Sequence, residues 1–325
     1  MNNLTPYIIR RGIQTILTIF LIIILNFFII NLAPGDPIRV IAGEFAFSNP
    51  EYVEALRKRW GLDKPVSERL FIYLNNLLHG DMGFSFRYMQ PVAEVIGERI
   101  LATLLLTFTS LILAFIIGVS LGVYSARRIG KPVDLALSFT MLLLYSMPVF
   151  WLGILLILFF GVHLRLFPIA GMFSSRVSYT GIFLVADVLW HMFLPVSTLT
   201  LAQLPIYYKI TKASVIEQFN EDYVRTFKAY GLNREVIFKK YILRNAILPP
   251  ITIFGLQLGF VLSGAALVEI IFGWPGMGRL LLDAAFYRDY PLLMGLYLVT
   301  AVSVALANLL TDLTYVFLDP RVKLR

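Results

Sequence analysis

Side chains that could carry out catalysis or hold a metal are scarce in this sequence of 325 residues. It has no cysteine and only three histidines, His79, His163 and His191. No two histidines stand at metal-ligand spacing, and the lack of cysteine excludes disulfides and thiolate sites. The phosphate-cradling G-x-x-x-x-G-K-[ST] loop and the zinc motif H-E-x-x-H are both missing. We therefore predict that the chain is not an enzyme and binds no cofactor or metal itself.

Three short motifs resemble protease signatures only superficially. The pairs Gly35-Asp36 and Gly80-Asp81 could suggest an intramembrane aspartyl protease, but they lie in "PGDP" and "HGDMG", outside the apolar stretches. Such contexts favour turns and caps. The "LSGA" at 262–265 lacks the first glycine of a rhomboid-type nucleophile motif. These motifs do not change the prediction.

Polar residues inside apolar stretches are functional candidates because they are costly in lipid. Glu269 could face a translocation path or hold a gate, or it could reach water at a helix end. Gln257 and Ser263, in the same apolar stretch, are further candidates for such a path. We expect interhelical hydrogen bonds from most of the other intramembrane polar residues: Asp187, His191, Gln203, Asn308 and Asp312.

Composition identifies the setting of these residues. The chain is 58% hydrophobic and 15% charged, with a mean hydropathy of +0.77, whereas soluble domains are nearer a quarter charged. We predict an all-α polytopic membrane protein with six transmembrane helices, since a span needs about 20 residues. The predicted spans are Ile8–Leu32, Ile100–Ala126, Leu135–Val162, Ala186–Ile210, Ala246–Phe272 and Pro291–Leu318.

The distribution of Lys and Arg predicts the orientation of these helices. Residues 209–245 hold eight basic and four acidic residues, whereas residues 33–99 hold eight basic and nine acidic. The net charge of +8 is thus concentrated on one side, which indicates topology rather than nucleic-acid binding. We expect a multi-pass protein of the cell (inner) membrane that contacts lipid. Both of its termini should lie in the cytoplasm.

The orientation suggests four regions. Residues 1–32 are the N-terminus and first span, and residues 33–99 are an extracytoplasmic helical cap between spans 1 and 2. Two amphipathic helices are predicted in this cap, within 49–61 and 63–79. Residues 100–318 form a five-helix core with a cytoplasmic loop at 211–245, and residues 319–325 are a cytoplasmic tail.

Small residues recur every four positions in two spans, which marks close-packing faces. The simpler interpretation is that these faces pack against other helices of the same chain. The alternative is that they pack across a subunit interface or against a gating helix. The two stripes are Ala114, Gly118, Gly122 and Ala126 in the second span, and Gly255, Gly259 and Ser263 in the fifth.

Residues 222–250 break the apolar sequence with two short amphipathic helices. Asp222 and Asn233 are placed to cap them, and Gly231 between them fits the position where positive φ is cheap. An aromatic face on a basic background indicates a docking site for a partner protein; a helix on the lipid surface is the alternative. The predicted docking residues are Asp222, Tyr223, Arg225, Phe227, Tyr230, Gly231, Asn233 and Tyr241.

The segment "DYVRTFKAYGL…ILRNAILPP" resembles the so-called EAA loop of ABC-transporter permeases, in their dipeptide/oligopeptide branch. Further ordered blocks carry the resemblance along the chain, among them "NLAPGDP", "SMPVFWLGILLILFF" and "VEIIFGWPGMGRLLLDAAFYRDYP". The generic acidic residue of the loop is absent, with Arg225, Thr226 and Phe227 at the three named positions, and Tyr241 stands where a histidine often does. Coupling should therefore depend on shape and apolar contact.

The resemblance implies the permease fold of a type I importer and a set of partners. These are a second homologous permease, two cytoplasmic ATPases that bind ATP and magnesium, and an extracytoplasmic solute-binding protein. Transported solutes in this branch include dipeptides, oligopeptides, oligosaccharides and nickel. Two other classes stay open from the residues alone: a stand-alone secondary transporter and a membrane scaffold without transport.

Overall fold

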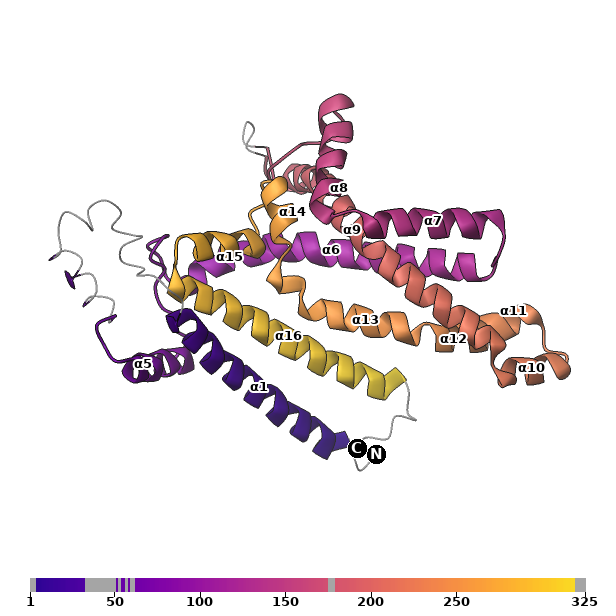
Figure 1. The fold of residues 1–325 in the computed structure, drawn as a ribbon, viewed down its shortest axis with the longest axis horizontal. Coiled ribbons are helices and arrows are strands. Elements are labelled where there is room, and N and C mark those ends of the chain that lie inside the picture. Colours follow the sequence, from indigo (N-terminus) through magenta and orange to yellow (C-terminus); the bar gives the residue numbers. More distant parts are fainter. Residues whose placement is uncertain are drawn as a thin grey trace. The chain divides into compact units, whose positions relative to one another are not determined.

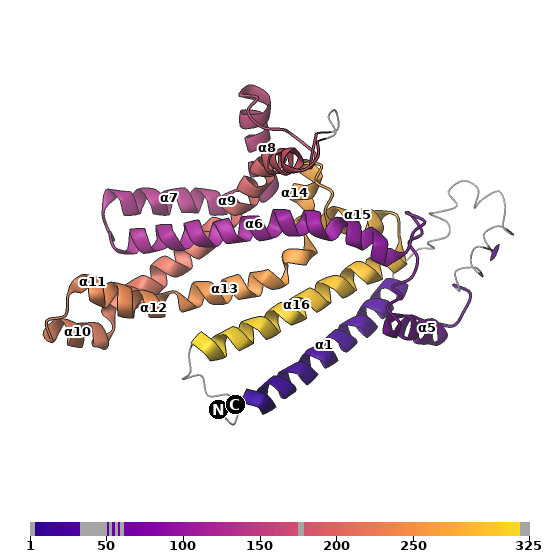
Figure 2. The same cartoon turned by 180° about the vertical axis from the view of Figure 1, so that it is seen from behind.

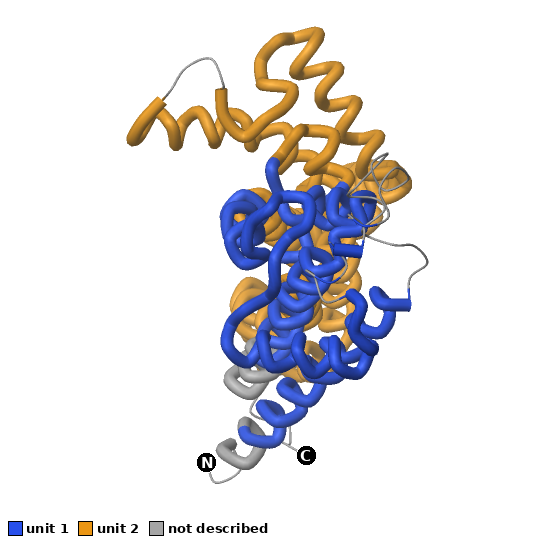
Figure 3. Tube along the Cα trace, turned by 90° about the vertical axis from the view of Figure 1, so that its left-hand side faces the viewer, with its two compact units in different colours: residues 1–103, 262–266, 275–325 blue, residues 104–261, 267–274 orange. Residues whose placement is uncertain are grey.

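The computed structural model describes residues 4–32, 51, 54, 55, 58, 62–174 and 179–318. These residues form helices and turns, with one isolated β-bridge between Phe84 and Pro91 (Figure 1). They divide into two compact units, coloured separately in Figure 3. Unit 1 comprises residues 1–103, 262–266 and 275–325, and unit 2 comprises residues 104–261 and 267–274.

By length and apolar composition, five described helical segments could each cross a membrane, or six spans result if one bent pair counts as a single span. This agrees with the predicted all-α polytopic class. The segments are Ile9–Leu32, Val92–Ala126, Ile182–Asn220, Arg234–Ser263 and Tyr290–Leu309, with the bent pair Pro132–Ser146 and Val149–His163.

In unit 1, α1 (Leu4–Leu32) lies beside α16 (Tyr290–Leu318) in both ribbon views (Figures 1 and 2). The unit also contains α5 (Val66–Leu78), α15 (Met277–Phe286) and residues 92–103 of α6 (Val92–Ala126). Its core is built of aliphatic side chains, of which Val92 and Leu292 are fully buried. Thr103 Oγ1 accepts the Met277 backbone N–H at 2.7 Å, which satisfies one donor in the first turn of α15.

Helix α5 confirms the second amphipathic helix predicted in the cap. Its half-buried residues include Leu70, Tyr73, Leu74 and Leu77, the four that the periodicity placed inward. Tyr73 stacks on Phe27 of α1 with ring centroids 5.8 Å apart, and burial raises the pKa of its phenol to about 12. The first predicted cap helix, residues 49–61, lies almost wholly outside the described residues, as do Gly35-Asp36 and the tail 319–325.

Gly80-Asp81 makes the turn that the sequence predicted. Gly80 has φ +81°, and Asp81 Oδ1 accepts the Gly83 backbone N–H at 2.8 Å. This side-chain bond to the backbone two residues on is an Asx-turn.

In unit 2, residues 104–126 of α6 pack against α9 (Ile182–Asn220) at very short range. A Cβ on Gly118 would lie 2.6 Å from Tyr207 Cβ, and one on Gly122 would lie 2.8 Å from Thr211 Cβ. Ala114 and Ala126 on the same stripe are buried as well. The stripe therefore serves intrachain packing, which was the simpler of the two interpretations.

The third predicted span, Leu135–Val162, is two helices instead of one. α7 (Pro132–Ser146) and α8 (Val149–Leu156) meet at a bend of 104°, and α8 continues into a π-helical segment, η1 (Ile157–His163). Pro148 explains the break, because proline disfavours α conformation in the residue before it, and Met147 has ψ 128°.

The fifth predicted span, Ala246–Phe272, is also interrupted. α13 (Leu248–Gly259) is followed by a 3₁₀ turn, η3 (Val261–Ser263), and by Gly264 at φ +77°, before α14 (Ala266–Ile271) begins. Thr107 Oγ1 donates to the Val261 carbonyl at 2.9 Å. A side chain thus satisfies a backbone group that the broken helix leaves open.

Candidate functional site

The charged segment after α9 folds as a compact helical element, residues 222–246. It consists of α10 (Asp222–Ala229), α11 (Arg234–Val236), a π-helical turn η2 (Ile237–Ile242) and α12 (Leu243–Ala246). We call it the 222–246 element. It belongs to unit 2 and is labelled through α10, α11 and α12 in Figure 1.

Gly231 makes the turn between α10 and α11, as predicted. Its φ is +76°; its N–H donates to Lys228 O at 3.0 Å, and Leu232 N–H donates to Phe227 O at 3.1 Å. These two bonds form the Schellman motif, which closes a helix with a left-handed glycine. No described atom lies within 4 Å of a Cβ built on Gly231, so only the backbone angle requires glycine here.

Of the two predicted caps, one is confirmed and one is wrong. Asn233 Oδ1 accepts the Glu235 backbone N–H at 2.8 Å and caps α11. Asp222 does not cap α10: the cap position is Glu221, without a side-chain cap bond, and Asp222 is the first helical residue. A carboxylate in that first turn still faces the positive end of the helix dipole.

Beneath the element lies an apolar group that we call the loop cluster. Val215 of α9 and Val224 of α10 are fully buried in it. Arg127, just after α6, pairs with Glu235 and lies over the Phe238 ring at 4.5 Å. The 222–246 element is therefore attached to the ends of both α6 and α9. The buried members of the loop cluster are Ala126, Val215, Val224, Ile237, Phe238, Ile242 and Ala246.

The aromatic residues of the element do not all face outward, which corrects the sequence-based expectation. Tyr223 and Phe227 are half-buried against the loop cluster, and Phe227 packs on Tyr241 with centroids 4.3 Å apart. Tyr223 also donates from its hydroxyl to Gln218 Oε1 at 2.8 Å. Tyr230 alone of the predicted aromatic residues is exposed, at 79%. Amphipathic spacing identified the apolar face, but the cluster it packs against comes from distant sequence.

The outer surface of the element is mostly charged. Arg225 Nη1 lies 3.7 Å from Asp222 Oδ1, and both side chains are well exposed. Lys228, Lys239 and Lys240 are exposed as well. We call these exposed charged side chains the rim; Tyr230 is exposed on the same element.

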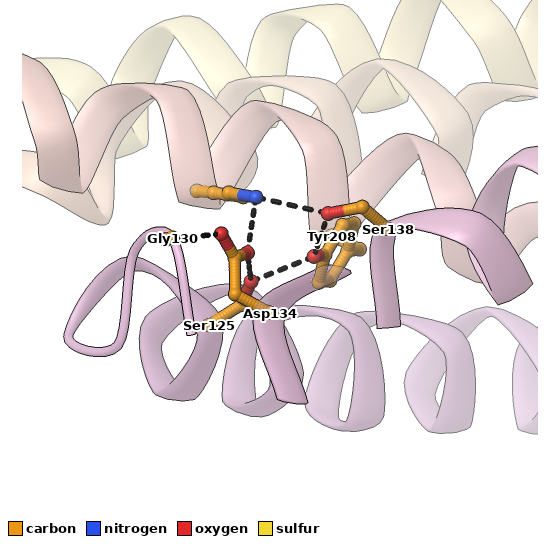
Figure 4. Close-up of polar contacts among 6 residues, drawn as sticks. Ser125, Gly130, Asp134, Ser138 and Tyr208 are labelled. Atoms are coloured by element: carbon orange, nitrogen blue, oxygen red, sulfur yellow. Dashed lines mark hydrogen bonds and ion pairs between the residues drawn. The ribbon is translucent and has the colours of Figure 1, made fainter. Parts of the chain in front are cut away.

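A polar ring with three buried members lies where the end of α6 and the start of α7 meet α9 (Figure 4). Asp134 at the start of α7 pairs with Lys212 of α9 and accepts a hydrogen bond from Ser125 of α6. Tyr208 OH lies 2.7 Å from Ser125 Oγ and 2.9 Å from Ser138 Oγ, and Lys212 donates to Ser138 at 2.9 Å. We call Ser125, Asp134, Ser138, Tyr208 and Lys212 the polar ring.

The three path candidates fall in different units, Gln257 and Glu269 in unit 2 and Ser263 in unit 1. Glu269 in α14 is fully buried, so it does not reach water within this chain, which excludes that alternative. Gln257 is half-buried in α13 of unit 2, and Ser263 is half-buried in η3 and belongs to unit 1. Gly255 and Gly259 of the second stripe are buried in α13.

Sequence reasoning missed the polar ring and a second buried carboxylate. Asp289 in unit 1 is fully buried; it accepts from Ser85 Oγ at 2.5 Å and from Arg87 N–H at 3.0 Å. In the sequence, Lys212 is one of the eight basic residues of 209–245, and Asp134 directly precedes the predicted span Leu135–Val162. The available signals were an acid directly before one apolar segment and a lysine just after another.

Helices long and apolar enough to cross a membrane, together with close-packing glycines, define a class: a multi-pass α-helical membrane protein. Two family models match the sequence. The binding-protein-dependent transport system inner membrane component matches residues 118–324, and the N-terminal model of the same kind of component matches residues 4–107. The chain belongs to this family and is a permease subunit of a binding-protein-dependent importer.

Characterised relatives cover essentially the whole chain. It is 38% identical over 334 aligned residues to the dipeptide transport system permease protein DppB of Escherichia coli (strain K12), covering 98% of both chains. It is 36% identical to the oligopeptide transport system permease protein AppB of Bacillus subtilis (strain 168), covering 98% of this chain and all of that one. The glutathione transport system permease protein GsiC of Escherichia coli (strain K12) is 36% identical, with 98% of both covered.

Proposed function

We propose that this chain is one of two permeases in an ATP-driven importer of peptides, and that residues 222–241 dock a cytoplasmic ATPase. The relatives named for dipeptide, oligopeptide and glutathione transport support the substrate class, since glutathione is itself a small peptide. Partner ATPases would bind the ATP and magnesium, a solute-binding protein would deliver the peptide, and both termini would be cytoplasmic.

One observation carries the docking proposal: the 222–246 element is closed by the Schellman turn at Gly231 and fixed to α6 and α9 by the loop cluster. A helix that merely floats on lipid would turn its aromatic face to the membrane. Here Phe227 and Tyr223 pack on the protein instead, and the exposed rim is charged. Such an element can transmit force, because a push on the rim reaches the long helices through packed side chains.

Alternating access then follows as a rigid-body movement. ATP-driven approach of the two ATPases would draw the two docking elements together and move the helices attached to them. Residues 33–99 would form an extracytoplasmic cap that meets the binding protein. Gln257, Ser263 and Glu269 stay candidates for the path.

Photocrosslinking tests the docking surface. p-Benzoylphenylalanine at Tyr230 should capture an ATPase subunit in host membranes. The same probe at Phe286 is a matched control, because both side chains are 79% exposed but Phe286 belongs to unit 1. Capture of lipid only at Tyr230, or of ATPase equally at both positions, would refute the docking proposal.

Transport tests the rest. The chain, tagged and purified with its partners, should carry radiolabelled dialanine, trialanine or glutathione into vesicles only with ATP and a binding protein. A lone chain that moves these peptides with an ion gradient would identify a secondary transporter.

A further inference from the structure

The hydrogen atoms of the polar ring can be assigned from its two charges. The Lys212 ammonium can only donate, so Ser138 Oγ accepts from it. The Asp134 carboxylate can only accept, so Ser125 gives it its single proton. Tyr208 must then donate to Ser125, and Ser138 must donate to Tyr208. All three hydroxyls point one way around the ring, from the cation to the anion.

Each residue of the ring is needed to satisfy the hydrogen bonds of its neighbours. Gly130 N–H donates at 3.0 Å to the second carboxylate oxygen of Asp134, which completes the site (Figure 4). Hydrogen bonds in a chain polarise and strengthen one another. Because Ser125, Asp134 and Tyr208 are nearly fully buried, each lost hydroxyl leaves a neighbouring donor or acceptor unsatisfied.

The ring joins three helices at one level. Ser125 is in the last turn of α6, Asp134 in the first turn of α7, and Tyr208 and Lys212 are on α9. Val133 and Leu135 on either side of Asp134 are exposed, so Asp134 makes the buried polar contact of this turn, while Met141 further along α7 packs with Leu204 and Tyr208 of α9. The ring therefore fixes the start of α7 to the other two helices.

The same two long helices carry the loop cluster within one turn. Ala126 directly follows Ser125 on α6, and Val215 lies three residues after Lys212 on α9. The glycine seam at Gly118 and Gly122 continues the contact between these helices on the other side of the ring. The ring thus lies between the loop cluster, which holds the 222–246 element, and the glycine contacts of the same two helices.

Stability alone is a weak reason to keep such a ring. A buried ion pair costs desolvation energy that apolar residues of equal volume would avoid, but it does fix one arrangement of its neighbours. We infer that the polar ring consists of positioning residues for coupling: it makes α6, α7 and α9 move as one body when the 222–246 element is displaced. This inference rests on the proposed function and deepens it.

Two adjacent tyrosines offer a matched test. Tyr208→Phe removes one ring hydroxyl. Tyr207→Phe removes the hydroxyl of the neighbouring buried tyrosine, which has no hydrogen-bond partner among the residues that the structure describes. The complete transporter is reconstituted in vesicles, and peptide imported per ATP hydrolysed is measured with whichever of dialanine, trialanine or glutathione the parental complex carries.

We expect Tyr208→Phe to assemble and hydrolyse ATP, while peptide imported per ATP falls about fivefold to tenfold, the shift that one hydrogen bond of ordinary strength produces in a two-state equilibrium. Tyr207→Phe should match the parental ratio. An unchanged ratio in Tyr208→Phe, or an equal fall in both variants, would overturn the inference.

A second position guards against misfolding. Ser138 is only half-buried, so Ser138→Ala should fold; it should also lower the ratio, and Ser138→Thr, which restores the hydroxyl, should recover it. If Ser138→Ala keeps the parental ratio, or Ser138→Thr fails to recover a lowered one, the ring is structural only. A parental complex that imports no peptide with ATP would refute the proposed function; normal parental import with unaffected ring variants would refute only this inference.

Discussion

The rings of Phe227 and Tyr241 pack with their centroids 4.3 Å apart, on the two sides of the Gly231 turn. This contact joins α10 to η2, so the two short helices form one piece. Phe227 therefore contributes to the shape of the 222–246 element, whereas the exposed Tyr230 is available to a partner.

Substitutions at Phe227 and Tyr230 should thus have different effects on stability and on ATPase binding. Phe227→Ala should lower the unfolding free energy by about 1 kcal/mol, because half of a phenyl ring loses its contacts, and it should weaken ATPase binding indirectly. Tyr230→Ala should weaken ATPase binding with no change in thermal unfolding in detergent. Equal melting temperatures for Phe227→Ala and Tyr230→Ala would contradict this division of roles.

Gly231 offers a test of backbone angle alone. A β-branched residue at φ +76° costs about 1–3 kcal/mol, and a Cβ at this position meets no described atom within 4 Å. We expect the variant to insert and assemble but to lose peptide-stimulated ATPase activity. Asn tolerates this conformation, so Gly231→Asn should keep most of the peptide-stimulated ATPase activity.

Gly80→Val is the matched control for that substitution. Gly80 has φ +81° and equally open surroundings, but it lies in unit 1. Both valine variants should lose comparable stability, and only Gly231→Val should lose ATPase stimulation. Loss of stimulation in both would mean that strain anywhere in the chain has this effect.

What the sequence could predict was local. The Gly231 turn and the Asn233 cap need only neighbouring residues, and amphipathic spacing marked the inward face of α5. Apolar length gave the spans, although Pro148 and Gly264 bend or break two of them; a proline or glycine is visible in sequence, but its effect on a long apolar run is decided by packing.

What the sequence could not predict depends on long-range pairing. Asp134 and Lys212 are 78 positions apart, and Ser85 and Asp289 are 204 apart. The residues next to each of these side chains in the sequence do not indicate which distant residue it will contact. For the same reason the inward packing of Phe227 was missed, because the loop cluster is assembled from α6, α9 and η2.

Membrane orientation can be tested by labelling, since the chain has no cysteine. Single cysteines at Glu68 of α5 and at Asn233 are both on exposed positions. An impermeant thiol reagent should label the cysteine at position 68 in intact cells, and the one at 233 only after permeabilisation. The reverse pattern would reject the proposed orientation.

Asp289 should be essential to the fold of unit 1. Its two oxygens receive the Ser85 hydroxyl and the backbone N–H groups of Arg87 and Leu292. Asp289→Asn replaces one acceptor by a donor, which sets an NH₂ group against a buried donor and should cost about 1–3 kcal/mol in thermal unfolding. Asp81→Asn is the control: the exposed Asp81 makes one turn bond, to Gly83 N–H, which an amide oxygen can replace, so its stability should hardly change. Similar losses in both would show that the buried acceptor has no special weight.

The contact between α6 and α9 makes the most direct stability prediction. A Cβ on Gly118 would sit 2.6 Å from Tyr207 Cβ and 3.0 Å from the Leu204 carbonyl oxygen. Neither atom is the end of a flexible side chain, so Gly118→Ala must push the two helices apart, at a cost of about 1–3 kcal/mol. Gly97→Ala on the same helix meets nothing within 4 Å and should be neutral or slightly stabilising, because alanine is the better helix former. Thermal unfolding of the two variants in detergent measures the difference. If Gly118→Ala melts as late as Gly97→Ala, α6 and α9 do not approach as closely as described, and the stripe must serve a contact outside this chain.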